Sequence, residues 1–464
     1  MQKSFSWKDF ISSIAVIAIP VALQNLLTTT GSMVDTMMLA PLGETTVGAV
    51  GLCAQFASLF FSCYWGFVGG GMLFFSQYHG AGDDRGIDRA YETTMIFMLS
   101  VGAIFFALGF FVPDRVMAVY TDKAAIGQIG AEYLHTVAWA YPLQVISMCM
   151  SALLRSTERV RIPLVASIAS VLTNVLCNWI FIYGKLGAPA MGARGAALAT
   201  VIAAVVNLGV VILTAQLTGY PCLFRFFTHL RLSGRWMSQY LHKCFPILCN
   251  ELLVGIGFTT CNIVLGRQAE EAIAALAVFR TLEGFVIAFF SGFSNASSVL
   301  VGKEVGAGEI DAAYARATRI TRLCAACIAA VCAGLFALHG PLLTAMGLSG
   351  ESFAIARGFL GIYCVAAVIR MCNWTLNDTF RAAGDAARGT VLEIVFMYLM
   401  VIPCVCLSGL VFHLPVFFVF GLCYVDEPIR CVLMHTHLFS GKWIKPVTPQ
   451  GKEALQDFLA RRKG

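Results

Sequence analysis

The sequence predicts an all-α integral membrane protein with twelve transmembrane helices in two pseudo-symmetric six-helix lobes. Three observations support this fold class. Of the 464 residues, 58% are hydrophobic and only 12% are charged. In a soluble protein, about a quarter of all residues are charged. Long apolar segments recur along the whole chain, and the mean hydropathy is +0.77. Finally, the second half of the chain repeats the first.

The apolar segments are long enough to cross a bilayer as helices, in which every backbone polar group is satisfied internally. The start of the chain, MQKSFSWKDF, is short and polar. It leads into a full-length span, so we do not expect a cleavable signal peptide. We predict spans at residues 10–39, 46–77, 91–113, 127–154, 161–184, 192–218, 238–266, 272–302, 314–338, 352–380, 389–411 and 414–438.

Basic residues predict the orientation, because cytoplasmic loops of membrane proteins carry an excess of Lys and Arg. With the N-terminus inside, the outer side holds six basic residues, namely Arg115, Lys123, Lys185, Arg194, Arg267 and Arg357. The inner side holds many more, including Arg85, Arg155, Arg231, Lys303, Arg319 and Arg381. Both termini are therefore expected in the cytoplasm. This bias also explains the net charge of +6 without nucleic-acid binding.

A shift of 226 residues without gaps superposes the two halves. It places Pro20 on Pro246, Gly31 on Gly257, Gly80-Ala81-Gly82 on Gly306-Ala307-Gly308, and Arg155 on Arg381. Six spans, an even number, fit into one repeat, so both halves should insert with the same orientation. We expect an N-terminal lobe over 1–222, a basic cytoplasmic linker over 223–243 and a C-terminal lobe over 244–440. The remaining 441–464 should form a partly helical cytoplasmic tail, with no evident chemistry.

The first predicted span carries a single ionisable residue, Asp35, at membrane depth. A carboxylate there is costly unless it faces a protein interior or a wet cavity. Polar or small residues share its helical face, namely Gln24, Thr28 and Gly31. Pro20 interrupts the backbone hydrogen bonds near the start of the same span and is a candidate hinge. We expect a moving helix that responds to cation binding; the alternative is a polar contact between helices.

The 17 cysteines are interpreted as small packing residues, because most of them lie inside apolar spans. The Cys324–Cys327 pair has no second pair or neighbouring histidine at ligand spacing, so we predict no metal site and no disulfide framework. The chain also has no HExxH, GxSxG or His/Asp cluster, so an integral membrane enzyme is not expected and no catalytic residue is assigned.

Paired motifs at matching ends of the two halves resemble those of the multidrug and toxic compound extrusion (MATE) transporters of bacteria. They are YHGAGD (78–83) with EVGAGE (304–309), and LLRSTERVRIP (153–163) with TFRAAGDAARG (379–389). MGARGAALAT (191–200) also fits. The resemblance covers essentially the whole chain. One departure is Glu158, where the family more often has glycine and where the second half has Gly384; we expect it to alter only a cytoplasmic turn.

The resemblance implies two six-helix lobes around a central cleft that opens alternately to either side of the plasma membrane. It implies export of organic compounds, often cationic and amphipathic, driven by inward H⁺ or Na⁺. We expect a monomer whose partners are small-molecule substrates and membrane lipid, with no cofactor. The alternative function is a flippase for lipids or lipid-linked oligosaccharides, which shares the architecture. For that function, however, we would expect more cationic residues along the cleft.

In several members of the family the cation site lies inside the N-terminal lobe. Its acid corresponds to Asp35, and its other polar groups correspond to Asn174, Asn178 and Thr200. Spacing gives independent support, because Ser167, Ser170, Asn174 and Asn178 recur at helical intervals on one span. One carboxylate among neutral oxygens can take a proton, or a single Na⁺ with carbonyl help. We favour H⁺ over Na⁺. The alternative interpretation of Asn174 and Asn178 is interhelical hydrogen bonding without ion binding.

The second half has charged residues of its own within the spans. Some family members couple through a glutamate on the seventh span, but Glu251 lies in a different register relative to Pro246, which leaves its role open. We interpret Arg280 and Glu283 first as an intramembrane charge pair and second as a substrate contact. A polar stripe on the tenth span consists of Arg370, Asn373 and Asn377, with Asp378 beside it, and Asp426, Glu427 and Arg430 are expected to form a structural network.

Overall fold

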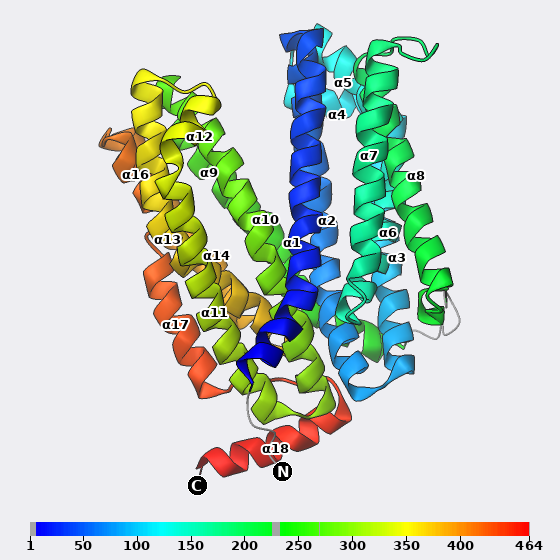
Figure 1. Cartoon of the computed structure of the whole chain (residues 1–464), viewed down its shortest axis with the longest axis vertical. Helices are drawn as coiled ribbons and strands as arrows, with labels where there is room; N and C mark the ends of the chain where they lie inside the picture. The colour runs from blue at the N-terminus through cyan, green and yellow to red at the C-terminus, as the bar shows by residue number, and fades with distance from the viewer. Residues whose placement is uncertain (1–5, 225–232, 269, 464) are drawn as a thin grey trace. The chain divides into compact units, whose positions relative to one another are not determined.

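The computed structural model describes residues 6–224, 233–268 and 270–463, and its regular elements are all helices (Figure 1). Ten of the described helices are long and apolar enough to cross a membrane, or eleven if one bent pair counts as a span. The predicted all-α membrane fold class is confirmed. By their contacts the residues form two compact units. The N-terminal unit comprises Leu23–Phe75 and Asp84–Tyr240, and the C-terminal unit comprises Met1–Ala22, Ser76–Asp83 and Leu241–Gly464.

Two long helices contribute to both units. They are α1 (Trp7–Leu39), which ends in the short turn Ala40–Leu42, and α2 (Glu44–Ala81). The first part of α1 and the last turns of α2 belong to the C-terminal unit, and the remainder belongs to the N-terminal unit. The predicted lobe boundaries at 222 and 243 remain a prediction, and part of the predicted linker, 225–232, lies outside the described residues.

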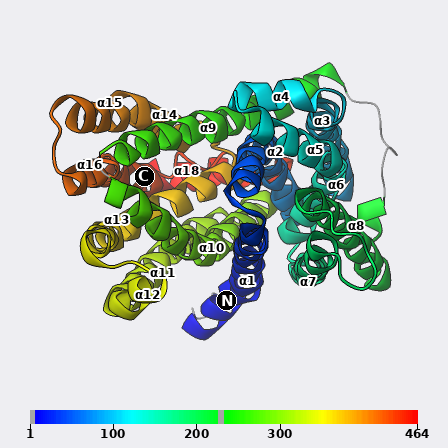
Figure 2. The same cartoon turned by 90° about the horizontal axis from the view of Figure 1, so that it is seen from above.

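The other helices of the N-terminal unit follow one another up to residue 224. They are α3 (Asp84–Phe111), α4 (Pro113–Tyr120), α5 (Ala124–Val137), α6 (Ala140–Ser156), α7 (Arg161–Tyr183), α8 (Ala193–Leu217) and the short turn Pro221–Phe224. Helices α7 and α8 run side by side over their whole length (Figures 1 and 2). This pairing brings the polar stripe predicted on α7 next to Thr200 on α8.

The C-terminal unit contains the helices from α9 onward. They are α9 (Gly234–Gly266), α10 (Glu270–Ala307), α11 (Ile310–Ala337), α12 (His339–Ala345), α13 (Gly350–Ala382), α14 (Arg388–Phe396), α15 (Ile402–Cys406), α16 (Val416–Leu422), α17 (Glu427–Ser440) and α18 (Pro449–Lys463). Helix α13 packs against α10, α11 and α17 (Figure 2). Helix α18 confirms the helix expected in the tail and packs against α10 and α11.

The predicted fourth span, 127–154, is not one straight helix. It consists of α5 and α6, which meet at an angle of 49°. Pro142, in the first turn of α6, has no N–H to donate to the carbonyl of Ala138, and its ring would clash with that carbonyl in a continuous helix. The sequence analysis missed this effect of Pro142.

The last two predicted spans are also irregular. The segment Arg388–Val411 is long and apolar enough to cross a membrane, but two π-helical stretches, Met397–Val401 and Leu407–Val411, flank α15. Pro403, near the start of α15, accounts for the first of them, since proline disrupts the α-helical ladder. The predicted span 414–438 consists of two short helices, α16 and α17, and the buried acids Asp426 and Glu427 lie at their junction.

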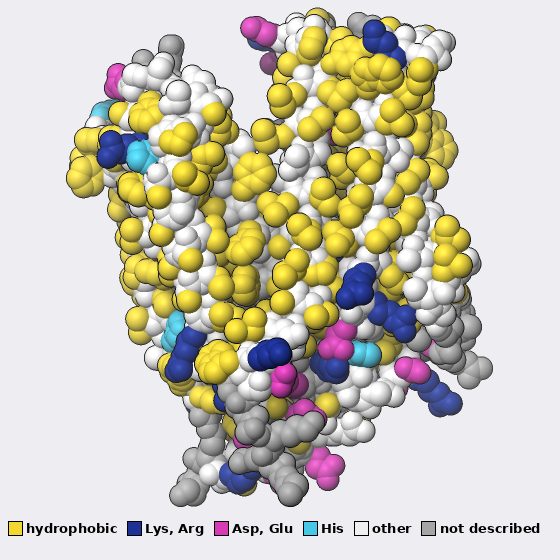
Figure 3. All heavy atoms as spheres, viewed as in Figure 1, with side chains coloured by type: hydrophobic (Ala, Val, Ile, Leu, Met, Phe, Trp, Pro, Cys, Tyr) yellow, Lys and Arg dark blue, Asp and Glu magenta, His cyan; other side chains and the backbone are white. Residues whose placement is uncertain are grey.

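Apolar side chains cover most of the helix surface visible in Figure 3, and many of the charged side chains there lie near helix ends. Inside the N-terminal unit, the rings of Phe60 and Tyr141 pack with centroids 4.7 Å apart. Inside the C-terminal unit, those of Phe359 and Phe420 stack at 4.2 Å. Many of the described cysteines are buried, in agreement with their interpretation as packing residues.

The turn after α6 explains the departure at Glu158. Its φ is +62°, in the left-handed region that a residue with a Cβ rarely adopts. The equivalent position in the second half is Gly384, with φ +101°. A Cβ at Gly384 would lie 1.9 Å from the carbonyl oxygen of Lys445, so the tail leaves no room for a side chain there. Both turns therefore favour glycine, but only the second excludes other residues by contact.

Candidate functional site in the N-terminal unit

Asp35 lies on α1, half-buried against α7. Its Oδ1 accepts a hydrogen bond of 2.6 Å from Nδ2 of Asn178. Asn178 is 1% exposed, and its Nδ2 also donates to Oδ1 of Asn174, one helical turn earlier, at 3.1 Å. The structure thus brings together three of the four residues predicted for the cation site, in a chain of side-chain hydrogen bonds.

Neighbouring contacts fix how α7 lies against α1 and α8. The hydroxyl of Tyr183 donates to the carbonyl of Met38 at 2.7 Å. Gly31 faces Val171, whose side chain would lie 3.4 Å from a Cβ at that position. Ser170 donates to the carbonyl of Ala203 on α8 at 3.0 Å. Side chains of the predicted stripe on α7 therefore form hydrogen bonds with both α1 and α8. Gly31, on the Asp35 face of α1, allows α1 and α7 to approach closely.

The fourth predicted residue, Thr200, donates to the carbonyl of Ala196 in its own helix at 3.0 Å. Tyr133 on α5, a half-buried residue, lies close enough to both Thr200 and Asp35 to interact with them. Sequence reasoning missed Tyr133, because no spacing links residues on α5 to α1 or α8.

Asn178 leaves one polar atom unsatisfied. Its Oδ1 is buried and has no hydrogen-bond partner among the described residues. The amide donates both of its N–H groups, one to Asp35 and one to Asn174, which suits an ionised Asp35. A protonated carboxyl could instead donate to an amide oxygen, so a rotation of this amide can satisfy either state of Asp35. The described residues contain no cluster of three or more His, Cys, Asp or Glu side chains that could hold a metal ion.

Pro20 and Gln24 lie further back on α1, and both are partly exposed. Pro20 lies inside the continuous helix Trp7–Leu39. The boundary between the compact units falls shortly after it, between Ala22 and Leu23. The backbone carbonyl of Gln24 accepts a hydrogen bond of 2.9 Å from Thr28. The hinge role of Pro20 and the substrate role of Gln24 remain predictions.

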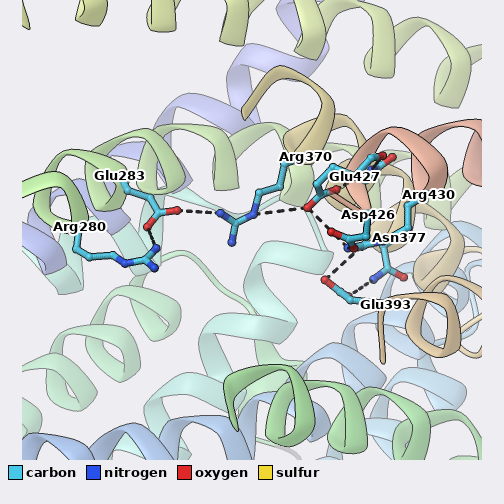
Figure 4. A network of polar contacts seen from close by, with 9 residues as sticks. Arg280, Glu283, Arg370, Asn377, Glu393, Asp426, Glu427 and Arg430 are labelled. Carbon is cyan, nitrogen blue, oxygen red and sulfur yellow. Dashed lines mark hydrogen bonds and ion pairs between the residues drawn. The ribbon is translucent and has the colours of Figure 1, made fainter. Parts of the chain in front are cut away.

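The C-terminal unit contains an extended buried network of charges (Figure 4). Arg280 bonds to Glu283, as the sequence predicts, and also to Asn262. Glu283 accepts a second bond, of 2.8 Å, from Nη1 of Arg370, whose Nε lies 3.8 Å from Glu427. An isolated Arg280–Glu283 pair was therefore too simple an interpretation. Removing both of its members would leave Arg370 without its nearest carboxylate.

The network continues to α14 and α17. Arg430 lies 3.1 Å from Asp426, 3.7 Å from Glu427 and 3.3 Å from Glu393. Asn373 donates to Glu427 at 2.8 Å, and Asn377 donates to Glu393 at 3.1 Å. The two asparagines of the predicted stripe on α13 thus bind carboxylates of the network, and Figure 4 shows Asn377 beside Glu393. The predicted contacts among Asp426, Glu427 and Arg430 are confirmed.

A second group of charges surrounds Arg381 at the end of α13. Its Nη1 lies 3.5 Å from Glu251 on α9 and 3.3 Å from Asp378 on its own helix. Asp378 also accepts a hydrogen bond from Ser294 on α10. Glu251 is therefore paired with a guanidinium group, whereas Asp35 accepts its hydrogen bond from the side-chain amide of Asn178.

A protein-family model described as MatE matches residues 20–180 and again residues 246–406. The chain belongs to the MATE family. The two matches begin and end 226 residues apart, which confirms the duplication and the resemblance seen in the paired motifs. The protein is therefore a multi-pass membrane transporter of a family of multidrug transporters.

Curated relatives of this MATE protein are bacterial. An uncharacterized transporter of Bacillus subtilis, YisQ, is 23% identical over 89% of this chain and 90% of its own length. A probable multidrug resistance protein of Rhizobium meliloti, NorM, is 25% identical over 67% of this chain and 66% of its own.

Solved structures of MATE proteins share the fold. A crystal structure of MATE in complex with MaL6 has a TM-score of 0.83 at 17% identity and covers 93% of this chain and 96% of that one. A mutant of the Vibrio cholerae MATE transporter VcmN also has a TM-score of 0.83, at 15% identity, and covers 93% of this chain and 97% of that one.

Proposed function

We propose that this MATE protein is a secondary active exporter of organic, often cationic and amphipathic compounds, driven by inward H⁺. The observation that carries the proposal is the bond of 2.6 Å between Asn178 and Asp35 on neighbouring helices. It gives one titratable group, at membrane depth, a partner whose amide can serve either protonation state. The names of relatives such as the multidrug resistance protein NorM of Vibrio vulnificus support the substrate class.

Protonation would act on α1 through this bond. An ionised Asp35 accepts from the amide of Asn178, whereas a neutral carboxyl has a proton to donate and a weaker attraction for the amide N–H. The contact between α1 and α7 therefore depends on the proton. Pro20 has already removed one backbone hydrogen bond of α1, so bending there costs less than elsewhere along the helix. Proton binding would thus change the shape of α1 and with it the access to the substrate.

We further propose that the protein lies in the bacterial plasma membrane as a monomer, with both termini in the cytoplasm. The turns after α2 and α10 would face the cytoplasm, because basic residues are retained there and Arg85, at the start of α3, and Lys303, near the end of α10, lie close to these turns. Arg225 and Arg231, which support the same orientation, lie outside the described residues. Na⁺ remains the alternative coupling ion, since a carboxylate and amide oxygens are also ligands for a hard cation.

The test uses purified protein in liposomes, a fluorescent organic cation, and H⁺ and Na⁺ gradients imposed separately. We expect dye movement by the wild type with the H⁺ gradient, and near-background movement by Asp35→Asn, which is nearly isosteric but cannot titrate. Asp114→Asn is the matched control, because Asp114 is an exposed acid on α4. Its transport should equal that of the wild type.

Other outcomes contradict the proposal at separate points. Dye movement only with Na⁺ would overturn H⁺ coupling. Movement of a labelled lipid without dye transport would favour the flippase. Near-normal transport by Asp35→Asn at matched protein amounts would move the coupling site away from the N-terminal unit, with Glu251 as the next candidate.

A further inference from the structure

The end of α2 and the end of α10 touch through their backbones. A Cβ added to Gly80 would lie 1.9 Å from the carbonyl oxygen of Lys303, and one added to Gly306 would lie 1.9 Å from that of Gln77. Both glycines come from the repeated GAG motifs, and both segments belong to the C-terminal unit. We call this contact between Ser76–Asp83 and α10 the glycine crossing. Only residues without a side chain allow such an approach.

Gln77 joins the glycine crossing to two further segments. Its side chain is 0% exposed. Its Nε2 donates to the carbonyl of Ala382, at the end of α13, at 2.7 Å. Its Oε1 accepts from the backbone N–H of Val447, in the tail, at 2.8 Å. Since a buried amide needs partners for both its donor and its acceptor, Gln77 is satisfied in this position only while the tail and α13 remain in place.

The tail, which the structure describes over residues 442–463, is docked over the same place. Thr448 donates to the carbonyl of Gly306 at 2.8 Å, and the N–H of Lys445 donates to the carbonyl of Ala383 at 2.9 Å. Trp443 and Phe458 are buried in an apolar cluster with residues of α10, α11 and α13. Through these contacts the first residues of the tail lie over the glycine crossing, and α18, which follows them in the chain, packs against α10 and α11 (Figure 1).

Asp385 anchors the tail through charge. Its Oδ1 lies 2.9 Å from Nζ of Lys445, and its Oδ2 lies 2.9 Å from Nε2 of His437. Burial alone would raise the pKa of Asp385, but the hydrogen bonds from His437 and Lys445 outweigh it and lower this pKa. A lowered pKa means that the stabilisation is present above the usual aspartate range and is lost only as the pH falls through the lowered value. The anchor is therefore charged at cytoplasmic pH.

The two halves of the duplication differ at this point. Gly384 gives the tail room to pass, whereas the equivalent Glu158 carries a side chain. Most of α2 belongs to the N-terminal unit, while its last turns at the crossing belong to the C-terminal unit. A movement that separates α2 from α10 must break the bonds of Gln77 first.

We propose that residues 442–464 form a latch on the transport cycle, and that Gln77 is the positioning residue through which this latch holds the glycine crossing together. The proposal rests on the proposed function, because it assumes that the crossing opens and closes during transport. Release of the tail would free Val447 and Thr448 from the crossing, and α2 could then leave α10. Docking of the tail would favour the state with the crossing intact.

Amide hydrogen exchange tests the latch without any transport measurement. Gln77→Met keeps the size of the side chain but loses both hydrogen bonds. Exchange should become about tenfold faster in the tail peptide 443–451 and in the crossing peptide 72–83, a change that corresponds to ~1.4 kcal/mol. Gln77→Glu should show a smaller increase, because burial favours the neutral carboxyl, which can accept from Val447 and donate its O–H to Ala382.

Gln456→Met is the matched control, since Gln456 is exposed on the same tail, and exchange should equal that of the wild type. Peptide 355–376 of α13 serves as the folding control and should remain protected in every variant. Faster exchange in the tail with an unchanged peptide 72–83 would overturn the latch, as would unchanged exchange in both. General loss of protection in Gln77→Met, with Gln77→Glu no better, would make Gln77 a folding residue and would also overturn it.

Dye transport separates this proposal from the proposed function. If the wild type moves no dye, the proposed function fails, whereas the exchange data still decide whether Gln77 couples the tail to the crossing. If the wild type transports, Gln77→Met should change the maximal rate and leave KM nearly unchanged, because the hydrogen bonds of Gln77 go to Ala382 and Val447 and not to the Asp35 site. A change in KM alone would contradict the latch.

Discussion

The charge network of the C-terminal unit predicts an asymmetry between arginine and glutamate substitutions. Its ion pairs involve three guanidinium groups, Arg280, Arg370 and Arg430, and four carboxylates, Glu283, Glu393, Asp426 and Glu427. Removing a guanidinium group increases the excess of buried negative charge, whereas removing a carboxylate reduces it. We therefore expect Arg370→Met to destabilise the protein more than Glu283→Gln.

The magnitudes follow from burial. The side chains of Arg370 and Glu283 are 4% and 5% exposed, and loss of one partner from such a pair costs about 3–5 kcal/mol. Arg370→Met should fall in this range, because it leaves Glu283 and Glu427 with fewer cations. Glu283→Gln should cost about 1–3 kcal/mol, since the amide oxygen can still accept a hydrogen bond from one of the two arginines, whereas the carboxylate accepts from both through separate oxygens. The double variant Glu283→Leu with Arg370→Met should cost less than the sum of its single changes.

The assay is the midpoint of thermal unfolding in detergent, together with the yield of monodisperse protein. Arg461→Met is the control, because the Arg461–Asp311 pair is exposed, 66% and 64% for the two side chains, and such pairs contribute little. Equal midpoints for Arg370→Met and Glu283→Gln would refute the argument that the excess of buried carboxylates makes loss of a guanidinium group the more costly change. A midpoint for Arg370→Met equal to that of Arg461→Met would refute the importance of the network for stability.

Two further predictions concern the turns and the orientation. Glu158→Gly should raise the unfolding midpoint, because a left-handed conformation costs a residue with a Cβ roughly 1–2 kcal/mol, whereas Gly384→Ala should lower it through the clash with Lys445; equal effects of the two changes would contradict this explanation. Cysteines introduced at Arg319 and Lys185, in a background without native cysteines, should react with an impermeant maleimide on intact cells only at position 185, and the reverse pattern would overturn the orientation.

Much of the fold could be predicted because it depends on local properties of the chain. Span lengths follow from apolar runs, and the duplication follows from a constant offset. The grouping of Asn174, Asn178 and Asp35 was also expected, because the resemblance to the MATE family implied it and the spacing of the two asparagines, one turn apart on one span, supported it. The break at Pro142 was missed, since the apolar run continues through it and the proline lies in the first turn of the second helix.

Contacts between distant segments could not be derived from spacing. The 2.8 Å bond from Arg370 to Glu283 joins α13 to α10, and it exists only because these helices pack together. Tyr133 reaches Thr200 in the same way, from α5 to α8. The tail is the clearest case. Its sequence is polar and resembles a solvated end, whereas Trp443 is completely buried and Val447 donates a backbone hydrogen bond to a residue of the second predicted span.

The division of the chain into units connects the two proposals. The chain passes between units within α1, after Ala22, and within α2, after Phe75. A change at Asp35 can therefore reach the C-terminal unit along one continuous helix, with Pro20 close to the boundary. The latch acts on α2, because Gln77 lies just after the unit boundary that follows Phe75. If both proposals hold, protonation of Asp35 acts on α1 and docking of the tail acts on α2, the two helices that belong to both units. Asp35→Asn and Gln77→Met should then affect transport in a coupled rather than an additive way.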